Sequence, residues 1–288
     1  MQLNVPKQIR LPSGCRLAYA EYGDPAGKPV FFLQGTPSSR LMHPDEDVSR
    51  ELGARVIVVD RPGFGHSDFQ RGRRLLDWPE QLCAVADALG IGRFAVAGVS
   101  GGGPYALACA HWIPQRLTAV AVVGGSAPMS APGLTAGMAR ERRIGYFVAT
   151  RLPWLVQPLL WLTNNPRRDL HRFFNRYTAD MCPADRAMLA QPEFRTMMMR
   201  NYAEATRAGL RGFAHEVVIV ARPWGFRLEH IAMEVRLWHG ELDTSTPLPM
   251  GRYMAQALPH CRATFVPGEG HFVMFTHWRE IATELLAG

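Results

Sequence analysis

Cysteine is scarce in this chain, and its scarcity excludes several classes of protein. Among 288 residues there are five cysteines, which lie far apart and form no C-x-x-C pair. Such a set is too sparse for a disulfide framework or a cysteine zinc site, and it is typical of a reducing compartment. We therefore expect a cytoplasmic protein without a structural metal.

Long apolar runs are also absent. The richest run, Trp154 to Leu162, is interrupted by Gln157 and Pro158. It is about half as long as the roughly 20 residues of a membrane-spanning helix. The first residues, Met1 to Lys7, lack the apolar centre of a signal peptide. We expect no membrane span.

Motifs for phosphates, metals and nucleic acids are missing as well. No Lys-Ser/Thr pair follows Gly101-Gly102-Gly103, and the chain holds no G-x-G-x-x-G and no H-E-x-x-H. The net charge of +7 comes from scattered arginines, with no run denser than Arg71-Gly72-Arg73-Arg74. We expect no cofactor, no metal and no nucleic-acid partner. A small molecule is the expected ligand, and the sequence leaves the oligomeric state open, a homo-oligomer included.

What the chain does contain is an alternation of short apolar runs with helical patterns. This alternation predicts an α/β domain with a mostly parallel, doubly wound sheet. Arg55–Val59, for example, is a continuous apolar run of the kind found in strands buried on both faces. A hairpin is predicted over residues 4–22. A helix is predicted over residues 77–89, where Asp77 and Glu80 have the spacing of a capping box.

The alternation stops at about Ala127 and resumes at Val235–Trp238. The segment between them contains helix-like stretches, many arginines and several tryptophans, and no strand pattern. A closing helix is predicted over Trp278–Leu286. We predict a core formed by residues 1–126 and 231–288, with an inserted helical cap over residues 127–230.

A serine stands at a sharp turn in Gly98-Val99-Ser100-Gly101-Gly102. This segment follows the apolar run Phe94–Ala97 and precedes a helical pattern. A serine between a strand and a helix adopts strained dihedrals, and the flanking glycines let neighbouring backbone approach. The hydroxyl is thereby exposed, with the next amide and the helix N-terminus directed at the group it attacks. Ser100 is predicted to be a nucleophile.

A serine hydroxyl needs a base to take its proton, and the base needs an orienting carboxylate. Of ten histidines, His271 lies in a glycine-flanked loop between the last apolar run and the last helix. Asp243 follows the preceding strand, and Glu241 and Glu269 are alternatives that the sequence leaves open. A histidine base predicts that activity falls below about pH 6.

The order of these three segments gives the chain a resemblance to the α/β-hydrolases. The resemblance implies the α/β-hydrolase fold and a catalytic triad of Ser100, Asp243 and His271. It also implies that Asp60–Ser67 is a scaffold loop. Serine in place of aspartate at position 100 argues against the epoxide-hydrolase and haloalkane-dehalogenase branches of that family.

The resemblance also implies an oxyanion hole. Gln34-Gly35-Thr36-Pro37 matches the family's His-Gly-x-Pro motif, so that the backbone N–H groups of Thr36 and Gly101 would be its two donors. The chain departs from the family at Gln34, where histidine is usual. We expect the glutamine side chain to fix the loop by hydrogen bonding.

The cap contains aromatic and methionine side chains that suit an apolar, irregular substrate. The candidate substrate-binding residues are Trp154, Trp161, Phe173, Met198 and Trp224. The plainer alternative is that these residues pack the helices of the cap.

The sequence therefore predicts a serine hydrolase that cleaves a small or medium apolar ester or lactone through an acyl-enzyme. The same triad would also serve carbon–carbon bond hydrolysis, acyl transfer or a cofactor-free lyase or oxygenase step. A third interpretation is a non-catalytic ligand-binding receptor on the same fold.

Overall fold

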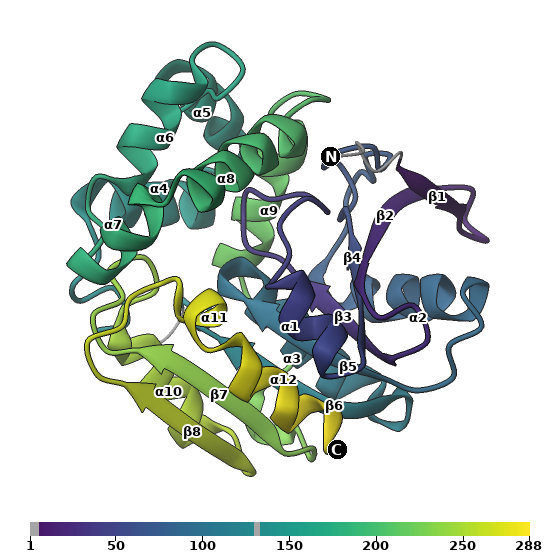
Figure 1. Cartoon of the computed structure of the whole chain (residues 1–288). Helices are drawn as coiled ribbons and strands as arrows, with labels where there is room; N and C mark the ends of the chain where they lie inside the picture. The colour runs from purple at the N-terminus through teal and green to yellow at the C-terminus, as the bar shows by residue number, and fades with distance from the viewer. Residues whose placement is uncertain (1–5, 130–132) are drawn as a thin grey trace.

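An eight-stranded sheet lies at the centre of the computed structural model, which describes residues 6–129 and 133–288 (Figure 1). The strand order is β1-β2-β4-β3-β5-β6-β7-β8, and the pairs β1–β2 and β2–β4 are antiparallel while the other pairs are parallel. The predicted mostly parallel sheet is confirmed. Asn4 and Val5 of the predicted hairpin lie outside the described residues. The strands are β1 (Lys7–Arg10), β2 (Arg16–Gly23), β3 (Lys28–Leu33), β4 (Ala54–Val59), β5 (Phe94–Val99), β6 (Leu117–Val123), β7 (Val235–Gly240) and β8 (Cys261–Val266).

Helices cover both faces of this sheet, because alternate side chains of the buried strands point to opposite sides. Phe31 packs with Trp78 on one face, and Phe32 packs with Trp278 on the other. The first face is covered by α2 (Trp78–Ala88), α3 (Gly103–Trp112) and α10 (Leu248–Ala257). The second face is covered by α1 (Glu46–Glu51), α11 (Val273–Thr276) and α12 (Trp278–Leu286). The sheet is therefore doubly wound.

The chain between β6 and β7 is helical, and its described residues form no strand. We call residues 127–230 the cap, after the predicted division, and its helices form a separate group beside the sheet (Figure 1). They are α4 (Arg140–Arg151), α5 (Val156–Thr163), α6 (Leu170–Thr178), α7 (Pro183–Ala190), α8 (Pro192–Ala205) and α9 (Arg211–Ala221). Short 3₁₀ helices are η1 (Leu75–Asp77), η2 (Ser100–Gly102), η3 (Pro114–Arg116), η4 (Pro153–Leu155) and η5 (Leu228–His230). None of the helices that the structure describes combines the length and apolar character needed to cross a membrane.

The predicted capping box at the start of α2 is wrong. Asp77 Oδ2 accepts a hydrogen bond from the backbone N–H of Arg74 at 2.7 Å, so its side chain helps to cap the N-terminus of η1 instead. An N-cap side chain normally accepts from the second or third helical N–H, and here the second residue is Pro79, which has none. Asp77 itself already has helical dihedrals, with φ −79° and ψ −17°.

Candidate active site

Ser100 lies at the turn from β5 into α3. Its φ is +54°, and it is the one non-glycine residue with positive φ in the described ranges. The glycines around it are required by space: a Cβ at Gly98 would collide with the carbonyl of Gly102, and one at Gly102 would collide with the backbone of Leu33. A left-handed serine held between such close contacts has the geometry of a nucleophile elbow.

The structure brings Asp243 and His271 into contact from two separate strand-end loops. His271 Nδ1 lies 2.8 Å from Asp243 Oδ2. Asp243 Oδ1 accepts hydrogen bonds from the backbone N–H groups of Ser245 at 2.7 Å and Thr246 at 2.9 Å. Because Nδ1 faces the carboxylate, Nε2 is the ring nitrogen left for proton transfer.

Thr246 is a member of this cluster that sequence reasoning missed. Its Oγ1 lies 2.8 Å from Asp243 Oδ2, 3.3 Å from His271 Nδ1 and 2.7 Å from the carbonyl oxygen of Gly124. Its position three residues after Asp243 in a Thr-Ser-Thr-Pro turn was a signal, since such hydroxyls often bond a nearby carboxylate or backbone group.

Electrostatics keep Asp243 charged and favour a proton on His271. Burial acts to raise the pKa of Asp243, but His271 lowers it by charge and hydrogen bonding, and the net pKa lies below the ordinary value. Burial acts to lower the pKa of His271, but Asp243 raises it more, and the net pKa lies above the ordinary value of 6.5. The pair is therefore a carboxylate beside a histidine of increased basicity.

The loop with the expected oxyanion donors lies directly against Ser100. A Cβ added at Gly35 would lie 3.2 Å from the Ser100 Cβ, and one added at Gly101 would lie 3.5 Å from the backbone nitrogen of Thr36. Gln34 donates from Nε2 to the carbonyl oxygen of Val59 at 2.9 Å, which fixes the loop as expected. The backbone N–H groups of Thr36 and Gly101 thus belong to segments in contact at the nucleophile.

A buried arginine supports the same loop from behind. Arg61 donates to the carbonyl oxygens of Gln34 at 2.5 Å and Gly35 at 2.8 Å, and to Thr36 Oγ1 at 3.0 Å. Its Nε bonds Glu216 of α9 at 2.7 Å, and both side chains are fully buried. Glu216 therefore connects the cap to three consecutive residues of the expected oxyanion loop.

The other buried groups around Glu216 complete a network. Arg73 bonds the second carboxylate oxygen of Glu216 at 2.5 Å and the hydroxyl of Tyr105 at 2.8 Å. Burial acts to raise the pKa of Glu216, but the charges of Arg61 and Arg73 lower it below its ordinary value. A buried carboxylate between two guanidinium groups is charged and fully paired.

The cap also holds the loop that bears His271. Asp185 of α7 is buried and accepts hydrogen bonds from the backbone N–H groups of His271 and Phe272, both at 2.9 Å. Asn201 of α8 holds the other side of the site, since its Oδ1 accepts from the N–H of Ser39 at 2.7 Å and from Ser39 Oγ at 3.0 Å. Three buried polar side chains of the cap thus bind loops of the core.

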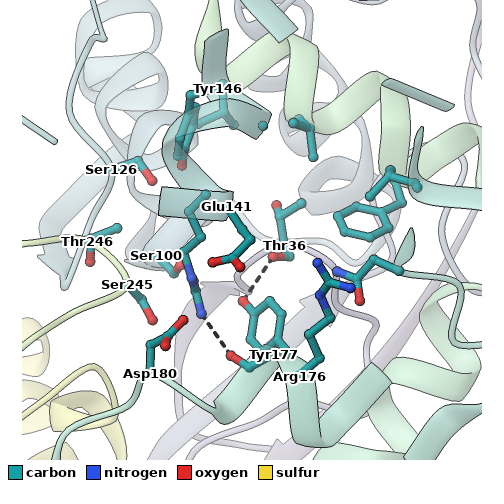
Figure 2. A pocket seen from close by; sticks show the side chains of 18 of the residues that line it. Thr36, Ser100, Ser126, Glu141, Tyr146, Arg176, Tyr177, Asp180, Ser245 and Thr246 are labelled. Carbon is teal, nitrogen blue, oxygen red and sulfur yellow. Dashed lines mark hydrogen bonds between the residues drawn. The ribbon is translucent and has the colours of Figure 1, made fainter. Parts of the chain in front are cut away.

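A cavity of about 340 Å³ opens beside Ser100, between the strand-end loops and the cap. Figure 2 shows the hydroxyls of Ser126, Ser245 and Thr246 on one side of it and Arg176 on the other. Its apolar wall is formed mainly by Leu159, Leu160, Phe213, Val217 and Val220. A second, smaller cavity is lined by both Ser100 and His271. The proposed nucleophile and base therefore face a common space.

Tyr177, on α6 of the cap, lines this cavity. The hydroxyl of Tyr177 donates to the carbonyl oxygen of Thr36 at 3.4 Å, and the Tyr177 carbonyl accepts from Arg142 at 2.8 Å (Figure 2). Glu141, Arg142, Arg176 and Asp180 also line the cavity, so its wall contains charges of both signs.

A family model described as alpha/beta hydrolase fold matches residues 28–277. The chain belongs to this family. It is 28% identical over 235 residues to the 2-hydroxymuconate semialdehyde hydrolase of Pseudomonas putida, and the match covers 79% of this chain and 74% of that protein. It is 25% identical over 243 residues to the 2-hydroxy-6-oxononadienedioate/2-hydroxy-6-oxononatrienedioate hydrolase of Burkholderia vietnamiensis. This match covers 82% of this chain and 76% of that protein.

Among solved structures, a hydrolase from Pseudomonas aeruginosa matches this α/β-hydrolase with a TM-score of 0.75. The match covers 100% of both chains at 16% sequence identity, so it supports the fold. The predicted fold and family are confirmed.

Of the five predicted substrate-binding residues of the hydrolase, one lines a cavity at Ser100 and four do not. Trp154 and Trp161 are 70% and 53% exposed, and Phe173 and Trp224 are buried in hydrophobic clusters. None of these four lines either cavity at Ser100, whereas Met198 lines the smaller one. Sequence alone did not separate aromatic side chains that pack helices from those that face a cavity.

Proposed function

We propose that this α/β-hydrolase is a serine hydrolase that cleaves a carboxylic ester or lactone through an acyl-enzyme. The observation that carries the proposal is the left-handed Ser100 sharing a cavity with His271, whose Nδ1 is hydrogen-bonded to Asp243. A serine hydroxyl, an imidazole and a buried carboxylate in this relation are the groups that acyl transfer needs.

The proposed reaction has two steps. Ser100 Oγ attacks the ester carbonyl while His271 Nε2 takes its proton, and the proton passes to the leaving alcohol as the carbon–oxygen bond breaks. Water then attacks the acyl-enzyme, giving its proton to His271, and the acid is released as Ser100 recovers its hydrogen. The N–H groups of Thr36 and Gly101 would stabilise the oxyanion in both steps.

The cavity suggests a substrate with one apolar part and one polar part. Its apolar wall, which includes Leu160 and Phe213, suits an alkyl or aromatic acyl group. Its hydroxyls and charged side chains would bind the polar part. We therefore propose esters or lactones of small or medium size.

A fluorophosphonate probe tests the nucleophile. We expect the probe to label the wild-type protein and not Ser100→Ala, with Ser126→Ala as the matched control because Ser126 lines the same cavity. Labelling of Ser100→Ala equal to that of the wild type would refute the assignment. Absence of labelling in all three proteins would favour the receptor interpretation.

Carbon–carbon bond hydrolysis is the second candidate, and the comparisons favour it. Both relatives named above match about four-fifths of the chain, and their names describe hydrolases of oxo-dienoate compounds. In such a step water adds across a carbon–carbon bond, one fragment leaving as a carboxylic acid and the other taking the proton as an enol. Arg142 and Arg176 in the cavity wall would suit an anionic substrate of this type.

A comparison of kcat/KM separates the two reactions. The wild-type protein is assayed with p-nitrophenyl esters of rising chain length and with a 2-hydroxy-6-oxohexa-2,4-dienoate. A preference for the esters supports the first proposal. A preference for the dienoate of about tenfold or more would replace it with the second.

A further inference from the structure

The outer side of the cap exposes apolar side chains to an unusual degree. Eight large apolar residues are exposed in the described ranges, and six of them lie between positions 144 and 162. The most exposed are Trp154 at 70%, Leu162 at 68%, Phe147 at 61% and Trp161 at 53%. Apolar exposure concentrated in one segment in this way marks a surface that contacts something other than water.

Three of these residues lie on one side of the segment formed by η4 and α5. Trp161 and Leu162 follow Trp154 by seven and eight positions, about two helical turns, which puts them on one side of the η4–α5 segment. Phe147 is exposed on α4, which is joined to η4 by the single residue Leu152. We call this set the outer face.

The opposite side of α5 belongs to the active site. Val156 is buried against α9, and Leu159 and Leu160 line the cavity beside Ser100. The helix therefore has one side turned to the cavity and the other turned outward. A partner bound to the outer face would be separated from the Ser100 cavity by the width of one helix, α5.

The charge next to the outer face is mainly positive. Arg151, Arg167 and Arg168 are exposed beside these residues, and Asp169 is the one acid next to them in the sequence. The Arg168 guanidinium lies 5.2 Å from the Trp161 ring centroid, which places a cation beside an exposed aromatic ring. Arginine next to exposed tryptophan and leucine is the composition of helices that lie in the interface of an anionic membrane.

We propose that the outer face binds the surface of an anionic phospholipid bilayer. The tryptophans would lie at the level of the headgroups, with the arginines paired to lipid phosphates. α5 has eight residues, so it would rest on the bilayer rather than cross it. A second copy of the chain fits the face less well, because a two-fold contact would bring the same arginines of both copies together.

Vesicle sedimentation tests the proposal without any assay of turnover, so its outcome is independent of the proposed function. The wild-type protein is mixed with vesicles of phosphatidylcholine alone or of phosphatidylcholine and phosphatidylglycerol in equal parts. We expect binding to the anionic vesicles at least about tenfold stronger than to the neutral ones, and weaker binding at high salt.

Matched variants locate the binding surface. Trp154→Ser with Trp161→Ser should lower binding to the anionic vesicles about tenfold, and Arg151→Gln with Arg168→Gln should remove most of the preference for them. Trp112→Ser is the control, since Trp112 is 50% exposed on α3 of the core. Circular dichroism checks that each variant is folded.

Three outcomes would overturn the proposal. One is the absence of binding to anionic vesicles, and another is a loss of binding in Trp112→Ser equal to that of the double tryptophan variant. The third is a dimer in analytical ultracentrifugation that the double tryptophan variant converts to a monomer, because a second copy would then occupy the face.

Discussion

The cap buries polar side chains on its inner face, which packs against the core, and exposes apolar side chains on its outer face. This is the reverse of the usual distribution. The inner face buries polar groups, and Asp185, Asn201 and Glu216 are each hydrogen-bonded to a loop or arginine of the core. The outer face exposes Trp154 and Leu162 to solvent. Because a buried charge without partners is costly, such groups persist where they hold something in place. The inner face is thus suited to position the loops of the proposed catalytic residues, and the outer face to meet the proposed membrane surface.

The largest expected loss of kcat comes from a change in the core, and it is the reference for changes on the two faces of the cap. Asp243→Asn should lower kcat by about 10⁴-fold, because an asparagine favours the wrong tautomer of His271. Steady-state kinetics with a p-nitrophenyl ester measure this effect. Glu269→Gln is the control and should change kcat little, since the Glu269 carboxylate accepts a 3.2 Å hydrogen bond from Thr276 Oγ1 in an exposed position. A larger loss in Glu269→Gln than in Asp243→Asn would show that the orienting carboxylate is wrongly assigned.

Breaking the buried network from the core side should produce the next largest effect. Arg61→Met removes the hydrogen bonds to Gln34, Gly35 and Thr36, and should lower kcat by about 10²–10³-fold with a smaller change in KM. Removing one partner of a buried ion pair lowers the free energy of unfolding by about 3–5 kcal/mol, so rates are expressed per folded molecule. Partial rescue of kcat by Arg61→Lys would support a positioning role. A loss explained entirely by unfolding would contradict it.

The pH profile of the wild type tests the electrostatics of the site. His271 must be neutral to act as a base, and its pKa lies above the ordinary value of 6.5. Activity should therefore fall about tenfold for each pH unit below an inflection that lies above pH 6.5. This expectation lies above the value of about pH 6 that the sequence predicts, because the buried Asp243 carboxylate raises the pKa of His271. An inflection at or below pH 6 would contradict the structure.

A change on the inner face should have a moderate effect. Asp185→Asn weakens the support of the His271 loop and should lower kcat roughly tenfold. The charge of Asp185 also raises the pKa of His271, so its removal should move the acid limb of the profile to lower pH. Paired pH–rate measurements on the wild type and the variant detect the shift. A purely structural role would lower kcat and leave the limb in place.

Changes on the outer face should be the mildest for catalysis. Trp161→Ser and Leu162→Ser should alter kcat/KM for a water-soluble ester by less than about twofold, and the free energy of unfolding by about 0.5 kcal/mol or less. Chemical denaturation and steady-state kinetics measure both quantities. An effect as large as that of Asp185→Asn would remove the functional distinction between the two faces.

The sheet and the Ser100 turn were predictable because each is encoded over a few consecutive residues. The apolar run at Arg55–Val59 and the glycines around Ser100 specify their own local structure. The capping role of Asp77 was predicted wrongly, because two competing helix starts lie within four residues. The position of the cap aromatics relative to the cavities was not predictable, since periodicity does not show which side of a helix faces a cavity.

By itself, the sequence determined an α/β sheet, a serine at a strained turn, and a histidine and carboxylate in the family's order. The tertiary structure decided which groups support them. Arg61 and Glu216 are 155 positions apart, and Asp185 and His271 are 86 apart, so no local pattern marks either pair. Such pairs form because folding removes water from both partners at once, and each buried charge or N–H group must then find its partner in the chain.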